Sequence, residues 1–147
     1  MDLWELVARE RTRDALARYN WSGDAARLDD LAQCFCEHGE LELRSGEPVR
    51  GRAAIVELLG GVVAAPNATA EASKVKRIVR HNVTNSRFTE VRPDEARVAC
   101  YFTVVSEIGL DHFGRYRDVF VPVGDDWLIR HRFVLTDWSA PNSTMAR

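Results

Sequence analysis

Apolar residues in the first part of the chain recur at helical spacing. Between Asp2 and Tyr19 the apolar side chains share one helical face, with charged residues between them: Leu3, Leu6, Val7, Leu16 and Tyr19. Residues 20–24 break this pattern. A second helix is predicted after it, because apolar residues again recur at i, i+3, i+4 and i+7: Leu28, Leu31, Ala32 and Phe35. A third short helix is predicted over residues 53–59, ended by Gly60 and Gly61.

The rest of the chain alternates apolar and polar residues, which indicates strands. Residues 40–44 are predicted to form a first strand, and residues 62–73 a loop. Further strands are predicted over residues 74–85, 87–91, 96–108, 116–123 and 127–136. Because short turns such as Pro93-Asp94 join neighbours, antiparallel pairing through hairpins is expected.

Helices followed by long strands are typical of an α+β domain. Long strands twist, and a twisted sheet curves around whatever covers its concave side. We therefore predict a curved antiparallel sheet that forms a half-barrel with a pocket, with the three N-terminal helices on its concave side. Residues 1–138 are predicted to form this single domain, and residues 139–147 a flexible tail.

Composition narrows the classes of function. The 147 residues are 46% hydrophobic and 29% charged, without an apolar run long enough to span a bilayer. A net charge of −2 with interspersed signs gives no field for nucleic acid. The N-terminal residues resemble a helix start rather than a signal peptide, so a cytoplasmic protein is expected. We predict neither a nucleic-acid nor a membrane partner.

Three cysteines offer little metal-binding chemistry. An odd number without a signal peptide favours reduced thiols at Cys34, Cys36 and Cys100. Cys34 and Cys36 are two apart on a predicted helix and therefore point in different directions, and only His38 can join Cys34 on one face. No metal site is predicted.

His81 lies in a predicted strand and shares a face with Val75, Val79 and Val83. If the valine face is buried, an imidazole that titrates near neutral pH points into the interior. We expect it to meet Asp24, and the pair to transfer protons in a closed apolar pocket. An alternative is that Asp24 only caps the second helix, which it closely precedes.

Other polar and aromatic residues occupy faces that are expected to be buried. Tyr116 and Asp118 share a face with Phe120, and His131 shares one with Trp127, Ile129, Phe133 and Leu135, while Arg130 and Arg132 lie on the opposite side. These residues are candidates to line a cavity. Each can instead be a hydrogen-bonded structural group, and Tyr19 and Trp21 can be core aromatics.

Several fragments in order resemble the SnoaL-like branch of the nuclear transport factor 2-like superfamily, from Leu6 to about Trp138. They are Tyr19 with Asp24 five residues later, then 27–31 through Phe35, 51–55, Arg80-His81-Asn82-Val83-Thr84-Asn85, 114–118 and 127–129. The branch includes scytalone dehydratase, bile acid 7α-dehydratase and hexachlorocyclohexane dehydrochlorinase.

The resemblance implies a cone-shaped half-barrel, a cystatin-like roll, with an aspartate–histidine pair at its floor that is helped by a tyrosine. The matching residues here are Asp24, His81 and Tyr19. A last-strand arginine that contacts substrate in some members suggests Arg130 or Arg132. The sequence departs from scytalone dehydratase at Gly23, where that enzyme has a tyrosine, and it shows no clear match to that enzyme's second histidine.

The leading hypothesis is a cofactor-independent lyase or isomerase that acts on a small hydrophobic alicyclic, steroid-like or polyketide-like molecule. Asp24, His81 and Tyr19 would be catalytic, and Trp21, Tyr116, Asp118, Arg130, His131 and Arg132 would bind substrate. Aldol cyclisation, as in polyketide cyclases, is an alternative in the same pocket. A non-catalytic binding or assembly domain, like a ring-hydroxylating dioxygenase small subunit, is another. A homodimer through the outer sheet face is also expected.

Overall fold

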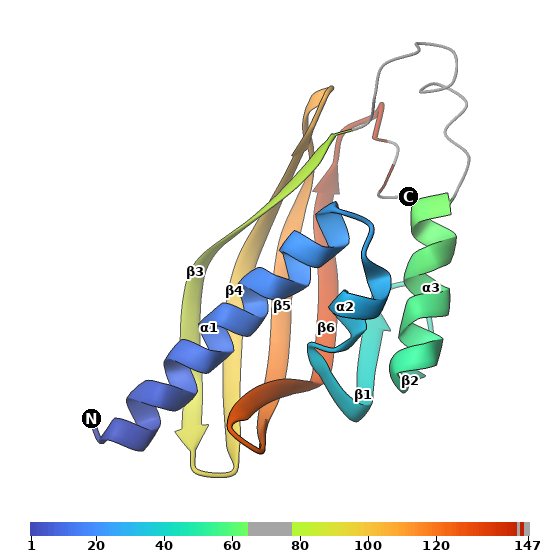
Figure 1. Cartoon of the computed structure of the whole chain (residues 1–147). Coiled ribbons are helices and arrows are strands. Elements are labelled where there is room, and N and C mark those ends of the chain that lie inside the picture. The colour runs from blue at the N-terminus through green and yellow to red at the C-terminus, as the bar shows by residue number, and fades with distance from the viewer. Residues whose placement is uncertain (65–77, 144, 146–147) are drawn as a thin grey trace.

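Six strands form one curved sheet in the computed structural model, which describes residues 1–64, 78–143 and 145. The strand order is β2-β1-β6-β5-β4-β3. The strands are β1 (Phe35–Leu43), β2 (Val49–Arg50), β3 (Val79–Arg92), β4 (Glu95–Ser106), β5 (Gly109–Val123) and β6 (Asp126–Ser139). Three helices cover one face of the sheet: α1 (Leu3–Asp24), α2 (Leu28–Ala32) and α3 (Arg52–Ala64). Figure 1 shows α1 crossing in front of β3, β4 and β5, which confirms the predicted α+β architecture.

Strand pairing is antiparallel at every interface except one. β1 runs parallel to β6, with Leu41 opposite Arg132, so the prediction of an antiparallel sheet is wrong at this pair. A parallel pair needs a long connection, and the chain between β1 and β6 holds α3 and four further strands. The two-residue strand β2 pairs with β1 and was not predicted.

Helix α1 is longer than its apolar pattern predicts, because it continues through residues 20–24 to Asp24. No proline interrupts this stretch, and Asn20 and Ser22 are buried against the rest of the protein. The helix stops where Ala26 adopts a left-handed conformation, with a φ of 58°. Asp24 therefore ends the first helix instead of standing free before the second.

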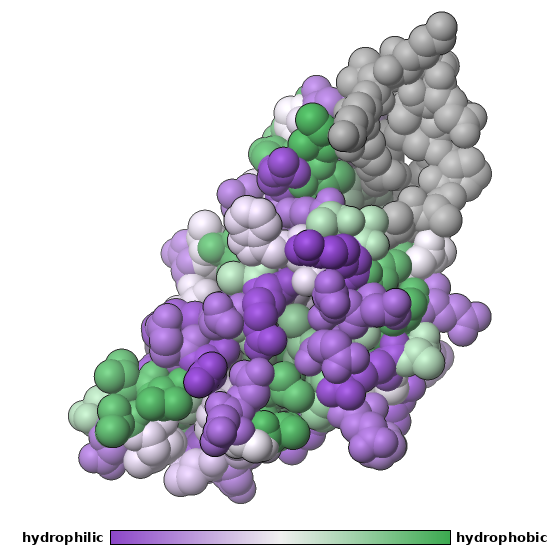
Figure 2. Space-filling view, viewed as in Figure 1, coloured by the Kyte–Doolittle hydropathy of each residue, from purple (hydrophilic) through white to green (hydrophobic). Residues whose placement is uncertain are grey.

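The buried face of α1 also differs from the predicted one in its first half. Leu3, Leu6 and Val7 are exposed, and small side chains such as Ala8, Thr12 and Ala15 face the sheet instead. Apolar atoms gather over this N-terminal end of α1 on the surface (Figure 2). A hydropathy pattern misses a contact made by alanine and threonine, whose small size allows the helix to approach the sheet closely.

The second helix ends earlier than predicted, because α2 stops at Ala32 and β1 begins at Phe35. Phe35 pairs with Ile129 of β6, so pairing with the sheet replaces the next helical turn. Cys36 and His38 consequently lie on a strand, and the prediction of a helix at this position is wrong. The third helix runs through Gly60 and Gly61 to Ala64, further than predicted.

The predicted strands at 74–85 and 87–91 are one strand, β3, with an irregular register between Thr84 and Arg87. Asn85 has a φ of 55° there, a left-handed conformation that bends the strand. Residues 62–64 of the predicted loop at 62–73 belong to α3 instead. The rest of that loop and the predicted strand start at 74–77, including Val75, lie outside the described residues.

A bulge in β6 exchanges the two faces of that strand. Val119 of β5 pairs with His131, but the next residue, Phe120, pairs with Ile129. Arg130 is therefore an extra residue, and Ile129 and Arg132 face the helices while His131 faces outward. The prediction that His131 shares a face with Ile129 is wrong, because alternation cannot reveal an inserted residue.

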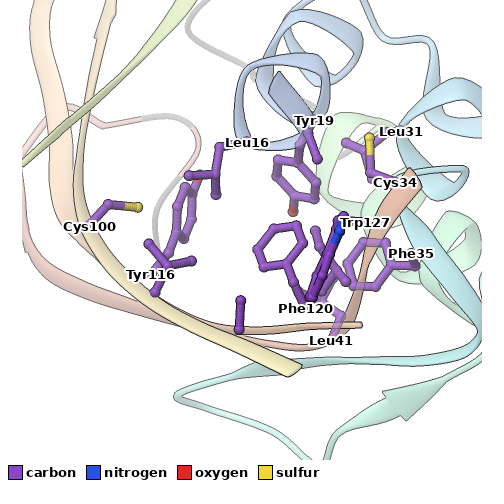
Figure 3. Packing of buried hydrophobic residues seen from close by; sticks show 14 of the residues in the cluster. Leu16, Tyr19, Leu31, Cys34, Phe35, Leu41, Cys100, Tyr116, Phe120 and Trp127 are labelled. Carbon is purple, nitrogen blue, oxygen red and sulfur yellow. The ribbon is translucent and has the colours of Figure 1, made fainter. Parts of the chain in front are cut away.

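The core lies between α1 and the concave face of the sheet. Figure 3 shows Tyr19 pointing from α1 toward the side chains of the sheet, near Phe120 and Trp127. Its ring lies 6.1 Å from those of Phe35 and Tyr116, measured between centroids. Helix α1 thus packs against both the middle of the sheet, at β6, and its edge strand β3.

Candidate functional site

Asp24 is the last residue of α1, at the end of the helix that carries partial negative charge. A carboxylate in that position needs hydrogen-bond donors from elsewhere. The helix α2 begins after Arg27, with no side-chain cap, so Asp24 does not cap it and that alternative is wrong. The donors come from β3 instead.

Both oxygens of Asp24 are bonded to one residue, His81 of β3. Asp24 Oδ1 lies 2.6 Å from His81 Nδ1, and Oδ2 accepts the backbone N–H of His81 at 2.9 Å. The side chains are 12% and 19% exposed, so the pair is shielded but accessible. When the imidazole is neutral, the carboxylate holds its proton on Nδ1, which leaves Nε2 as a proton acceptor. The predicted contact between these residues is present.

A cavity of about 910 Å³ opens between α1 and β3, with the pair in its wall. The lining residues come from α1 and its C-terminal end (Arg13, Leu16, Ala17, Asn20, Trp21, Asp24 and Ala25) and from β3 (Arg80, His81, Asn82, Val83, Thr84 and Ser86). Asn82 and Thr84 are exposed, so the cavity is open to solvent, and its surface combines apolar with polar side chains. The expectation that the pocket is closed is therefore wrong for the described part of the chain.

The predicted substrate-binding residues are divided between three places. Trp21 is 75% exposed at the cavity rim. Arg130 lies on the outer face of the sheet and bonds Glu95 at 2.7 Å, and His131, also outside, lies 2.9 Å from Glu42 Oε2. Only Tyr116, Asp118 and Arg132 face the interior.

Arg132 forms a fully buried ion pair in that interior. Its Nε and Nη2 each donate to an Asp118 oxygen at 2.8 Å, a bidentate arrangement. The guanidinium carbon lies over two tyrosine rings, 4.1 Å from the centroid of Tyr19 and 3.9 Å from that of Tyr116. Arg132 Nη1 has no hydrogen-bond partner within the described part of the chain. Tyr19 thus contacts Arg132 and is not among the cavity-lining residues.

Burial determines the protonation of this cluster. It raises the pKa of Tyr19 and of Tyr116 above the usual range, although Arg132 opposes the shift. Burial alone lowers the pKa of Arg132, but Asp118 outweighs it and the pKa is raised. Both hydroxyls therefore remain protonated at neutral pH and can donate, as Tyr116 does to Asn20 Oδ1 at 3.3 Å.

A second histidine lies beside His81 and was not predicted as a site residue. The rings of His112 on β5 and His81 have centroids 6.3 Å apart and meet edge to face, and both lie near Phe102. Burial lowers the pKa of His112, and Asp111 partly opposes this, so the neutral imidazole is favoured near neutral pH.

His112 shares the inner face of β5 with Tyr116 and Asp118. Extending the alternation backward through Gly114 would have found it. Glycine weakened that pattern, and it is required because a Cβ at this position would lie 1.9 Å from the Leu135 carbonyl oxygen.

The residues described contain no group of three or more histidine, cysteine, aspartate and glutamate side chains arranged to hold a metal ion. The thiols of Cys34 and Cys100 are buried, and burial raises the pKa of both. The titratable side chains that the structure brings together at this site are the carboxylate of Asp24 and the imidazoles of His81 and His112. No helix in residues 1–64 and 78–143 has the length and hydropathy to cross a bilayer.

The chain was compared with a family profile, with curated proteins and with solved structures. The sequence profile of the family described as a SnoaL-like domain matches residues 4–133. None of the curated proteins compared with the chain matches it.

Solved structures with the same architecture include a scytalone dehydratase-like protein from Novosphingobium aromaticivorans, with 21% identity and a TM-score of 0.78 over 95% of this chain and 91% of that one. LinA has 16% identity and a TM-score of 0.78, over 95% and 92% of the two chains. An NTF2-like protein with a cystatin-like fold, also from N. aromaticivorans, has 23% identity and a TM-score of 0.70, over 97% and 90%. At these identities the likeness establishes the fold.

Proposed function

The chain belongs to the SnoaL-like domain family, and we propose that it is a cofactor-independent lyase or isomerase that abstracts a proton from carbon. The observation that carries the proposal is the double hydrogen bond from Asp24 to His81 in the wall of a cavity. A carboxylate that orients an imidazole and stabilises its protonated form is a common arrangement for a general base. A structural neighbour described as scytalone dehydratase-like supports a dehydratase-type reaction.

In the proposed reaction, His81 Nε2 takes a proton from a carbon next to a carbonyl group of the substrate. The electron pair of that C–H bond forms the new double bond, and the bond to a hydroxyl group on the adjacent carbon breaks. The imidazolium of His81, stabilised by Asp24, returns the proton to the departing oxygen, so the products are an unsaturated ketone and water. One base on one side of the substrate suffices for this syn elimination.

His112 has a supporting role in this proposal. His112 is not among the cavity-lining residues, but its ring lies beside that of His81. In this proposal a substrate hydroxyl that reaches His81 also meets His112 Nε2, which the favoured neutral form leaves free to accept a hydrogen bond. Tyr19 was the predicted donor, but it contacts Arg132. We therefore assign the return of the proton to His81, and assign to Tyr19 the support of Arg132.

The cavity indicates the kind of substrate. Its volume of about 910 Å³ is large enough for an alicyclic or steroid-sized molecule. Leu16, Ala17 and Val83 offer apolar contacts near His81. We propose a small hydrophobic alicyclic or polyketide-like ketone.

The test is hydrogen–deuterium exchange at carbon. The protein is incubated in D2O with a panel of alicyclic β-hydroxyketones, and proton NMR follows both loss of the α-proton signal and formation of the unsaturated ketone. His81→Ala should lower the rate by ~10²–10⁴-fold. His131→Ala, which alters an imidazole on the outer face, is the matched control and should keep the rate. Full exchange by the His81→Ala protein would refute the proposal.

The same assay separates elimination from aldol cyclisation. Both reactions begin with removal of the α-proton, so both require His81. Elimination releases water and creates an unsaturated ketone, whereas the addition step of an aldol cyclisation conserves mass and forms a new carbon–carbon bond. Mass spectrometry of the products distinguishes them.

A further inference from the structure

Asp111 and His112 form a second carboxylate–imidazole pair beside the first. Asp111 Oδ1 lies 2.7 Å from His112 Nδ1, although successive strand residues ordinarily point to opposite faces. A bulge explains this: Val104 pairs with His112 and Val105 with Leu110, so Asp111 is an extra residue in β5. The bulge brings both side chains into the buried region of the protein.

Asp111 is held from the other side by the segment after β6. Its Oδ1 also accepts the Ser143 hydroxyl at 2.7 Å, and its backbone oxygen accepts the N–H of Ala140 at 2.7 Å. Ala140 and Ser143, which were predicted to lie in a flexible tail, thus form hydrogen bonds to β5. Asp111 is completely buried, and a buried carboxylate is costly unless donors stabilise it. Its position is therefore well defined by bonds on two sides.

We propose that Asp111 is a positioning residue for His112. It fixes the neutral imidazole with its proton on Nδ1 and thereby leaves Nε2 as the acceptor on the ring that lies beside His81. The titratable groups that face His112 are Asp111 on its own strand and His81 on β3, with Asp24 of α1 behind it. The role in catalysis rests on the proposed function, in which His112 accepts a hydrogen bond from the substrate.

Long-range proton–nitrogen NMR of the imidazole rings tests the proposal without a substrate. In the unaltered protein, above its pKa, His112 should carry its proton on Nδ1. Asp111→Ala should move that proton largely to Nε2, while the tautomer of His81 stays the same. Asp111→Asn keeps an oxygen acceptor but removes the charge, so His112 should titrate at lower pH than in the unaltered protein.

The matched control is Glu42→Gln, which alters the carboxylate beside His131 on the outer face and should leave His112 unchanged. A proton on Nε2 of His112 in the unaltered protein would overturn the proposal, as would an unchanged titration in Asp111→Asn. If Asp111→Ala fails to fold, the first and third measurements still decide. None of these results depends on the exchange assay, so the positioning role and the proposed function can fail separately.

Discussion

Asp24 and His81 are 57 residues apart, and the carboxylate of Asp24 bonds both the side chain and the backbone N–H of His81. β3 is the last strand of the described sheet, so its N–H groups that point away from β4 have no strand partner among the residues that the structure describes. Asp24 accepts a hydrogen bond from one of these edge N–H groups, that of His81, and thereby attaches the end of α1 to the sheet. The same contact that orients the imidazole therefore also fixes helix to strand.

Asp24→Asn separates these two functions. The amide can keep the bond to the backbone N–H through its oxygen, but its NH2 group would then face Nδ1 and force the His81 proton onto Nε2. We expect a rate loss of ~10²–10⁴-fold, as for loss of the base itself, with little change in the free energy of unfolding.

Asp24→Ala is the companion variant for stability. It leaves a shielded backbone donor without its partner, which costs ~1–3 kcal/mol. Urea denaturation measures both variants. If the Asp24→Asn protein removed the substrate α-proton at the original rate, the tautomer of His81 would not matter for the reaction.

The buried ion pair of Arg132 and Asp118 is expected to contribute to the stability of the fold. Arg132→Met leaves the buried Asp118 charge unpaired and should cost ~3–5 kcal/mol. Replacing both, in Arg132→Met with Asp118→Leu, should recover part of this loss. Arg130→Ala removes a half-exposed partner of Glu95, which keeps its ion pairs with Arg92 and Arg97; this control should cost ~0–1 kcal/mol. Equal effects of Arg132→Met and Arg130→Ala in chemical denaturation would contradict the expectation.

His112 should make stability depend on pH in mildly acidic solution. Because burial lowers its pKa below the ordinary 6.5, the unfolded chain binds this proton at a higher pH than the folded protein does. The stability that the neutral ring contributes is therefore present above pH 6.5 and is lost as pH falls through the lowered pKa.

His112→Gln should show a flatter pH dependence of the urea midpoint across this window. His131→Gln, a change on the outer face, serves as the comparison and should retain the slope. An identical slope in His112→Gln and the unaltered protein would show that His112 does not carry this dependence.

We propose that the outer face of the sheet joins two copies of the chain. It carries exposed Tyr101, Val105, Phe113 and Trp138, and the rings of Phe113 and Trp138 stack with centroids 5.5 Å apart. Light scattering should give the mass of a dimer, and Tyr101→Glu should give that of a monomer. Leu6→Glu tests the other apolar patch, at the start of α1 (Figure 2). Dissociation by Leu6→Glu alone would place the interface there instead.

Local patterns in the sequence predicted most of the helices and strands, and the strand and face on which His81 of the candidate site lies. A period of two requires only neighbouring residues, so alternation around His81 correctly predicted a strand with the imidazole on its more buried face. The order of helices and strands likewise predicted the α+β class. Helix ends were less certain, because α1 continues past Tyr19 for reasons of packing that no local pattern contains.

Tertiary structure alone decided how the site is assembled. Arg132 faces the interior and Arg130 does not, because one inserted residue in β6 exchanges the faces. His112 and Asp111 come together through another bulge, in β5, which alternation cannot register. The distance between Asp24 and His81 depends on where α1 crosses the free edge of the sheet. Such relationships arise from register and helix placement, which long-range packing sets, and so they do not appear in any short stretch of sequence.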